Sequence, residues 1–419
     1  MQMPEPAAAA RCSGHPASCV LLDTIGRNDF FVNATTAGTV TSAGWLFEVT
    51  FELVDPPSLS RCFFRYAGPP TSGRSGNNMT SVTVTVSGAD GAFLLVRLGF
   101  PEPGFTYRTA HDVFVYRAGP GAPSLQLVPP RPDRLSRYPI NLLSGYVAVL
   151  SCDDDGHCLV VVPKRQHEPF FFYHLDIFST KAGSWSEKIA KVADDTEPFY
   201  GGKILPSRVF SVDGGGLMAW VDVRHGILLC NVLDEDPQVR MIELPPLSPV
   251  NKHFGTEMDL NSIRDVAFSD GSFRFIELEH PDSDDDNPEQ YRWTANMFKR
   301  TVDPQDSWEL CGTVDSAELS PADSCFPDLC PPIWDEEEKR LTLDEVLCQY
   351  VTLNMYRDDV AYIKGKLDAR DPDGWVLAVD TRNNKLERVQ PFSEMVRYVC
   401  TVLQCDLSKY LSKGSRVME

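Results

Sequence analysis

Hydrophobic and polar residues alternate along most of this chain with a period of two, the spacing of a β-strand that buries one face. The clearest example is LMAWVDVRHGILLCNVLDEDPQVRMIEL, which begins at Leu217. Glycine and acidic residues interrupt the alternation at 213–216, 224–226 and 234–237, where turns are expected. The pattern predicts a four-stranded antiparallel unit with one strand ending at Val212 and three more at 217–223, 227–233 and 239–244.

The same order of strands and turns recurs along the chain. Copies cover 81–128, 263–314 and 351–389, and a looser copy covers 146–192. Equivalent positions in the third strand are spaced by about 60, 50, 70 and 80 residues, close to the repeat length of propeller blades once loop insertions are allowed. These equivalent positions are Tyr116, Phe178, Val232, Phe298 and Val379.

A repeated four-stranded unit predicts a β-propeller. One such sheet cannot cover both of its apolar faces, whereas radial packing of several sheets buries both faces and leaves only short edges. The first eighty residues contain enough strand-like sequence for one more blade. We therefore predict an all-β fold of six four-stranded antiparallel blades, with five or seven as alternatives.

The predicted domain organisation follows from the positions of the repeats. Residues 1–18 form a disordered leader rich in Ala and Pro, and 19–403 form one propeller domain. Within it, 280–290 is an acidic insertion between the second and third strands of a blade. Residues 314–347 are a linker with one short helix around LTLDEVL, and 404–419 form a short C-terminal helix and tail.

The composition narrows the classes of partner. A formal net charge of −20 over 419 residues argues against general binding to nucleic acid or anionic membranes, which requires clustered Lys and Arg. The chain has no apolar run of about 18 residues, and its leader lacks the pattern of a signal peptide. We expect an intracellular protein, cytoplasmic or nuclear, and assume a monomer.

The cysteines are expected to be reduced thiols. Twelve cysteines in a chain without a secretory signal are more typical of small buried hydrophobes than of disulfides. One cluster has enough cysteines for a zinc site, but it lacks the CxxC spacing of such sites, so no metal or other cofactor is predicted. This cluster consists of Cys311, Cys325, Cys330 and Cys348.

Reactive side chains are concentrated at one place in the sequence. Asp222, Arg224, His225 and Cys230 fall within nine residues. A Cys–His pair five positions apart across a turn would rarely face each other, so we interpret the group as polar turn residues rather than a catalytic centre. The sequence carries no GxSxG, HExxH, P-loop or kinase signature, and no catalytic residue is predicted.

The segment GLMAWVDVRHGILLCNVLDEDPQVRMIELP is similar to the motif of the plant family called domain of unknown function 1618, which is abundant in grasses. Here Asn231 replaces the Asp that is common in the family. The segments VTFELVDPP, VAYIKGKLD and GWVLAVDTRNNKLERV also resemble family members. The resemblance implies a propeller related to kelch-like and F-box-associated domains, with no established catalytic residue and with proposed roles in stress, defence or reproductive compatibility. The motif residues expected to be structural are Trp220, Asp222, Gly226, Cys230, Trp375 and Asp380.

The function predicted from these features is a non-enzymatic propeller that binds an unidentified protein partner on one face. Two alternatives are a ubiquitin-ligase substrate adaptor without its own F-box, and an enzyme with its site in the propeller channel. We expect Trp220, Trp375 and Trp185 to pack between blades. The acidic insertion could steer a basic partner through its five carboxylates, Asp282, Asp284, Asp285, Asp286 and Glu289.

Overall fold

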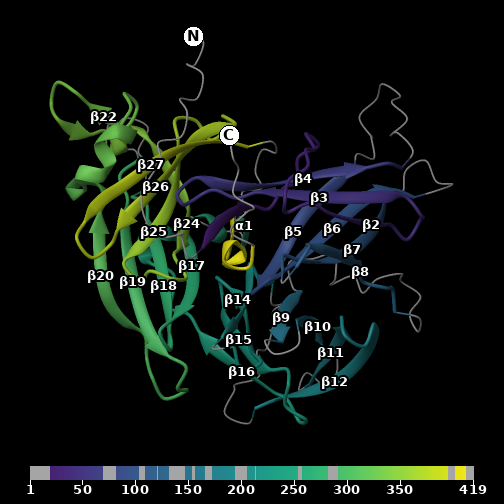
Figure 1. Cartoon of the computed structure of the whole chain (residues 1–419). Coiled ribbons are helices and arrows are strands. Elements are labelled where there is room, and N and C mark those ends of the chain that lie inside the picture. Colours follow the sequence, from purple (N-terminus) through teal and green to yellow (C-terminus); the bar gives the residue numbers. More distant parts are fainter. Residues whose placement is uncertain are drawn as a thin grey trace.

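The computed structural model forms a ring of six β-sheet blades around a central channel (Figure 1). The structure describes residues 19–68, 82–102, 109–119, 121–131, 147–152, 156–165, 172–193, 205–212, 214–252, 257–281, 291–394 and 402–411. The predicted leader and most of the predicted acidic insertion lie outside these residues.

Five blades consist of four consecutive antiparallel strands, as predicted, and the first strand of each blade lies innermost. Blade 2 comprises β5 (Thr83–Asp90), β6 (Phe93–Pro101), β7 (Thr109–Arg117) and β8 (Ser124–Leu127). Blade 3 comprises β9 (Ala148–Cys152), β10 (His157–Arg165), β11 (Phe172–Ser179) and β12 (Ser184–Val192). Blade 4 comprises β13 (Arg208–Val212), β14 (Leu217–Asp222), β15 (Gly226–Asn231) and β16 (Gln238–Glu243). Blade 5 comprises β17 (Arg264–Ser269), β18 (Ser272–Glu279), β19 (Thr294–Thr301) and β20 (Glu309–Asp315). Blade 6 comprises β24 (Leu347–Leu353), β25 (Val360–Lys366), β26 (Asp373–Asp380) and β27 (Lys385–Ser393), with the short β21 (Ser320–Pro321) added beside β27.

Blade 1 differs from the predicted plan because it combines both ends of the chain. It has five strands in the order β2-β3-β4-β1-β28, so the C-terminal strand pairs with the N-terminal one. β1 pairs in parallel with β4, whereas the prediction was a wholly antiparallel blade. This arrangement closes the ring through backbone hydrogen bonds. The strands are β1 (Val20–Asp23), β2 (Ala37–Val40), β3 (Leu46–Glu52), β4 (Leu59–Tyr66) and β28 (Val402–Cys405).

The hydrophobic core lies between the blades. Separate clusters fill the spaces between blades 1 and 2, 2 and 3, and 3 and 4, and a large one joins blades 4, 5 and 6. A fifth cluster, containing Leu21 of β1 and Tyr362 of β25, lies between blades 6 and 1. Each sheet therefore buries both faces against its neighbours, the physical reason for which the repeats predicted a propeller.

Helical structure is sparse in the described residues. One short α-helix, α1 (Glu257–Ile263), lies between blades 4 and 5 and was not predicted. The linker before blade 6 holds the two-stranded hairpin β22 (Trp334–Asp335) and β23 (Arg340–Leu341). Instead of regular helices, the linker around LTLDEVL and the C-terminus each form a 3-10 turn, Leu343–Glu345 and Leu407–Lys409.

The residues in the turns determine the hairpin geometry. The direction of the strands determines which turns lie at the same end of the propeller. Asp270 and Gly271 both have positive φ in the tight β17–β18 turn, a conformation that Asp and Gly adopt more readily than other residues. Strands 1 and 3 of a regular blade run in the same direction, so the strand 1–2 and 3–4 connections lie at one end. We call this end the exit face, because the innermost strands end there.

Candidate functional site

The turn that contains Asp222 and His225 is organised by the Asp222 carboxylate. One carboxylate oxygen accepts a hydrogen bond from the backbone N–H of Arg224 at 3.0 Å. The other accepts from the backbone N–H of Leu205 at 2.9 Å and lies 3.1 Å from Nδ1 of His225. Asp222 is 3% exposed. Its contacts fix the connection between the second and third strands of blade 4.

Cys230 lies too far from His225 to act with it. Within β15 (Gly226–Asn231), Cys230 lies four residues beyond Gly226, the residue after His225, which at the strand rise corresponds to about 13 Å. The Cys230 side chain is buried, and this burial raises the pKa of its thiol to about 12. A buried thiol at this distance from the imidazole lacks the geometry of a nucleophile–base pair.

The remaining motif residues lie in packing or turn positions. Trp220 is 1% exposed in the cluster between blades 3 and 4. Trp375 is half-buried against the cluster of blades 4 to 6. Gly226 permits a close backbone approach, because a Cβ atom there would lie 2.3 Å from the carbonyl oxygen of Ile242. Asp380 accepts hydrogen bonds from the backbone N–H groups that follow it in the β26–β27 turn.

Trp185 packs on blade 3 as a half-buried side chain. Its ring lies 5.5 Å from that of Phe178, and its indole N–H donates to the carbonyl oxygen of Pro129 at 2.7 Å. The acidic segment is placed only by its flanks: β18 ends at Glu279 and β19 begins at Thr294, which are the second and third strands of blade 5. Its five predicted carboxylates, 282–289, lie outside the described residues.

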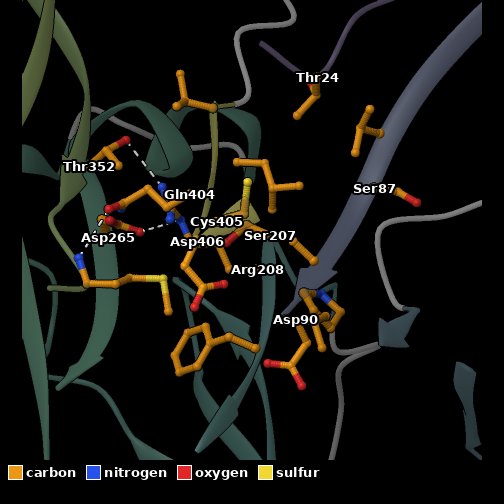
Figure 2. Close-up of a pocket in the computed structure, with 18 of the residues that line it drawn as sticks. Thr24, Ser87, Asp90, Ser207, Arg208, Asp265, Thr352, Gln404, Cys405 and Asp406 are labelled. Carbon is orange, nitrogen blue, oxygen red and sulfur yellow. Dashed lines mark hydrogen bonds and ion pairs between the residues drawn. The ribbon is translucent and has the colours of Figure 1, made fainter. Parts of the chain in front are cut away.

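The central channel holds a cavity of about 850 Å³. Its walls are formed by the innermost strands β5, β13, β17, β24 and β28 together with Ser151 of β9, so all six blades contribute. Figure 2 shows polar side chains from several blades converging on this space. A cavity of this size with convergent polar groups has the features typical of a ligand-binding pocket.

An ion pair joins blades 4 and 5 on one side of the channel. Arg208 of β13 places its Nε 2.6 Å from a carboxylate oxygen of Asp265 in β17, and its guanidinium donates to Oγ1 of Thr352 in β24 at 3.2 Å (Figure 2). The second oxygen of Asp265 accepts from the backbone N–H of Leu353 at 2.7 Å. Burial raises the pKa of the Asp265 carboxyl, and Arg208 opposes that rise. The ion pair thus connects blades 4, 5 and 6.

Two more polar residues link different blades around the channel. Asp90, at the end of β5, accepts hydrogen bonds from the hydroxyl of Ser211 at 2.6 Å and from the backbone N–H of Ser151 at 2.7 Å. Gln404 of β28 donates to the carbonyl of Leu353 and accepts from the backbone N–H of Met355 at 3.1 Å. Both residues thus serve the cohesion of the ring.

The exit end of the channel carries aromatic and charged side chains from the C-terminal segment and blade 6. Tyr356, Asp406 and Tyr410 all line the cavity. Lys409 lies 4.8 Å above the centre of the Tyr356 ring, and its Nζ is 3.3 Å from a carboxylate oxygen of Asp406. Two residues that line the cavity, Tyr356 and Asp406, thus place an aromatic face and a carboxylate against the same ammonium group.

No local sequence motif marks the channel residues. Arg208, Asp265, Gln404 and Asp406 come from three separate blades and belong to no local motif. Their shared property is a position on or just after an innermost strand, which is a signal that a sequence with known blade boundaries carries. Among the described residues, no group of three or more His, Cys, Asp or Glu side chains is arranged to hold a metal ion. The described helices include none with the length and apolar character needed to cross a membrane.

Comparison with known proteins gives one match in sequence. Residues 220–362 match the model of the family described as Protein of unknown function (DUF1618). The DUF1618 match covers about a third of the chain, from Trp220 in β14 to Tyr362 in β25. No curated protein matches the sequence.

Solved structures are similar only in broad outline. A xylan β-1,4-xylosidase from Bacillus halodurans C-125 is 10% identical, with coverage of 92% of this chain and 96% of that chain, and a TM-score of 0.29. The Cps50 (Swd1) β-propeller domain from Myceliophteria thermophila is 11% identical over 70% of this chain and 90% of that one, with a TM-score of 0.26. The β-propeller domain of the Trilobed protease from Pyrococcus furiosus is 11% identical over 78% and 98%, with a TM-score of 0.27. At these TM-scores, the assignment of six blades rests on the strand pairing of this chain.

Proposed function

We propose that this chain is a non-enzymatic propeller, a member of the DUF1618 family, which binds a basic segment of a protein partner on its exit face. The β15–β16 loop on that face carries the proposal, because it is held in one conformation while it exposes an apolar side chain and three carboxylates. Preorganised loops of this kind bind with a smaller loss of conformational entropy.

The conformation of the β15–β16 loop is fixed by a lysine of the neighbouring blade. Nζ of Lys188, in β12, donates to three successive carbonyl oxygens, those of Val232 at 3.0 Å, Leu233 at 3.2 Å and Asp234 at 2.8 Å. The side chain of Asn231 accepts from the backbone N–H of Leu233 at 3.1 Å. β12 and β16 also pair in parallel at their edges, which joins blades 3 and 4. The loop backbone is therefore tied to two blades.

The loop combines apolar and acidic character. Leu233 is 49% exposed, although it is a large apolar residue. Three consecutive exposed acidic residues follow it, Asp234, Glu235 and Asp236. An apolar anchor beside clustered carboxylates favours a partner segment with an apolar residue among lysines or arginines.

Further acidic residues on the exit face support the same partner chemistry. Asp270, Asp303, Asp306 and Asp358 are exposed in strand 1–2 and 3–4 connections of blades 5 and 6. With a net charge of −20, the protein is expected to attract a basic partner and to lose part of this attraction as salt rises. The acidic segment 280–290 connects strands 2 and 3 of blade 5, whose facing ends lie opposite the exit face, so we include it in the proposal only as a part of the net negative charge that attracts a basic partner.

A cross-linking experiment tests the proposed surface directly. We would place a photo-cross-linking amino acid at Leu233 and, as a control, at Leu310, which is 60% exposed on the outer strand β20. In extracts of cells that express the protein, repeated experiments should cross-link one basic protein to position 233. The variant with the cross-linker at position 310 should not capture this protein. Equal capture from both positions, or none from 233, would contradict the proposal.

Charge-neutralising variants test the electrostatic part with a defined probe, fluorescein-labelled octalysine. The triple variant Asp234→Asn, Glu235→Gln, Asp236→Asn should bind octalysine more slowly than the control Glu336→Gln, Glu337→Gln, Glu338→Gln. The control removes the same net charge from the exposed β22–β23 hairpin at the periphery (Figure 1). Equal association rates would show that only the total charge matters and would refute a specific role for the loop.

A further inference from the structure

The C-terminal segment after β28 passes over the exit end of the channel. Leu407 is fully buried in the cluster between blades 1 and 2, and Leu411 packs against the same cluster. Tyr410 lines the cavity and lies so close to Gly119 that a Cβ atom there would be 2.5 Å from the Tyr410 carbonyl oxygen. The backbone of the segment is therefore anchored by apolar and close packing contacts, independently of the lysine between them.

Lys409 extends from this anchored backbone towards blade 6. Its Nζ lies 4.8 Å from the centre of the Tyr356 ring and 3.3 Å from Oδ2 of Asp406. An aromatic face attracts an ammonium group through its quadrupole, and a carboxylate adds a charge-assisted hydrogen bond. The Tyr356 ring and the Asp406 carboxylate therefore hold Lys409 with the two kinds of contact by which proteins bind a lysine side chain.

We propose that Tyr356 and Asp406 form a binding site for a lysine side chain of the protein partner, and that Lys409 occupies this site in the free protein. This inference rests on the proposed function, since it names where a basic segment would insert. Both residues of the site line the channel cavity, so the site opens onto the cavity. An incoming lysine side chain would take the position that the Lys409 side chain now occupies. Lys409 acts as a built-in competitor.

The contacts of Lys409 are weak enough to be exchanged. The Lys409 side chain is 44% exposed, and an ion pair between residues three apart on the surface is worth little in water. A cation–π contact at an exposed site adds a similarly small amount. Together the ion pair and the cation–π contact correspond to roughly a tenfold preference for the state in which Lys409 occupies the site. The apparent affinity of the site for a lysine of the partner is lowered by the same factor. Removal of Lys409 should therefore raise the affinity for a lysine-rich ligand by about 3- to 10-fold.

The matched control is Lys339. It forms an ion pair with Glu336 at the same i,i+3 spacing, in the exposed β22–β23 hairpin. Lys409→Ala and Lys339→Ala remove the same charge and the same type of ion pair. Only the first uncovers the Tyr356–Asp406 site, so a comparison of the two separates the site from the general effect of a more negative protein.

The experiment measures the dissociation constant of fluorescein-labelled octalysine by fluorescence anisotropy, with octalysine acetylated on every side chain as the neutral probe. We expect Lys409→Ala to bind octalysine about 3- to 10-fold more tightly than Lys339→Ala. Adding Tyr356→Leu to Lys409→Ala should return the affinity to that of Lys339→Ala. Equal melting temperatures of the variants would confirm that the fold is intact, and acetylated octalysine should not respond to Lys409→Ala.

The outcomes distinguish this inference from the proposed function. Equal affinities of Lys409→Ala and Lys339→Ala would overturn the lysine site, while a dependence on Asp234–Asp236 would still support the exit face as the binding surface. A gain in Lys409→Ala that survives Tyr356→Leu would also overturn the site, because the aromatic face would then play no part. Failure of every variant to bind octalysine would overturn both proposals.

Discussion

Replacing Arg208 by Met removes the cation that forms an ion pair with the Asp265 carboxyl, which is buried in the channel wall. Asp265 is 2% exposed in its side chain, and Nε of Arg208 lies 2.6 Å away. Breaking a buried ion pair by removing one partner costs about 3 to 5 kcal/mol. Because the Arg208 side chain is 21% exposed, water screens part of this interaction, and we expect a loss of about 2 to 4 kcal/mol in the free energy of unfolding near neutral pH.

The pH dependence of this loss has a definite sign. Burial already raises the pKa of Asp265 while Arg208 opposes the rise, so the pKa should rise further in Arg208→Met. A carboxyl whose pKa is higher in the folded than in the unfolded protein favours folding when it is protonated. This contribution is lost as the pH rises through the folded pKa. The difference between the wild type and Arg208→Met should therefore be largest at pH 7 to 8 and shrink as the pH falls towards about 4 to 5.

Urea unfolding followed by tryptophan fluorescence measures the effect at each pH. The double variant Arg208→Met, Asp265→Asn removes both charges and keeps an oxygen to accept the Leu353 N–H. We expect it to recover most of the lost stability, to within about 1 kcal/mol of the wild type. A loss below about 1 kcal/mol in the single variant, or the same loss at pH 5 and pH 7.5, would refute the reasoning.

Three further predictions concern the core, the thiols and the acidic segment. Trp220→Ala should cost about 3 to 5 kcal/mol of unfolding free energy, because the residue is fully buried, while the half-buried Trp375→Ala should cost clearly less; urea unfolding that ranks them in reverse would contradict the packing described. Burial raises the pKa of the Cys230 thiol to about 12, so Cys230 should react slowly with maleimide in the folded protein. Mass spectrometry after brief treatment should find the exposed Cys311 labelled, and Cys230 labelled only after urea is added. Deletion of 282–289 should leave the melting temperature nearly unchanged, since a charged insertion contributes little to a core; a large decrease would show that it packs against the propeller.

The blades could be predicted because their signals are local. In blade 4 the alternation of 217–244 and its three turns predict β14, β15 and β16 to within one or two residues. Hairpin pairing joins residues that are close in the sequence, so the period of two and the turn residues are sufficient to specify it. The third strands contain four of the five predicted equivalent positions, Tyr116, Phe178, Phe298 and Val379, whereas Val232 lies one residue beyond the end of β15.

The C-terminus was harder to predict because its pattern is short and mixed. Val402–Cys405 is a strand of four residues whose partner, β1, lies almost the whole chain away. The following segment was predicted as a helix but forms a single 3-10 turn, Leu407–Lys409, before Leu411 packs against blades 1 and 2. Burial of two leucines at the channel end outweighs the weak helical pattern of so short a segment.

The sequence by itself therefore determined the blade as a unit and five of its copies, since each strand and turn is encoded within a few residues, while it left five, six or seven blades open. The tertiary structure alone decided how the ring closes, through the parallel pairing of β1 with β4 and the antiparallel pairing with β28. It also decided that Arg208 meets Asp265 and that Lys409 covers Tyr356. These residues come from different blades or from the C-terminal segment after β28, and their contacts arise only when the blades pack around one axis, so no spacing along the chain marks them in advance.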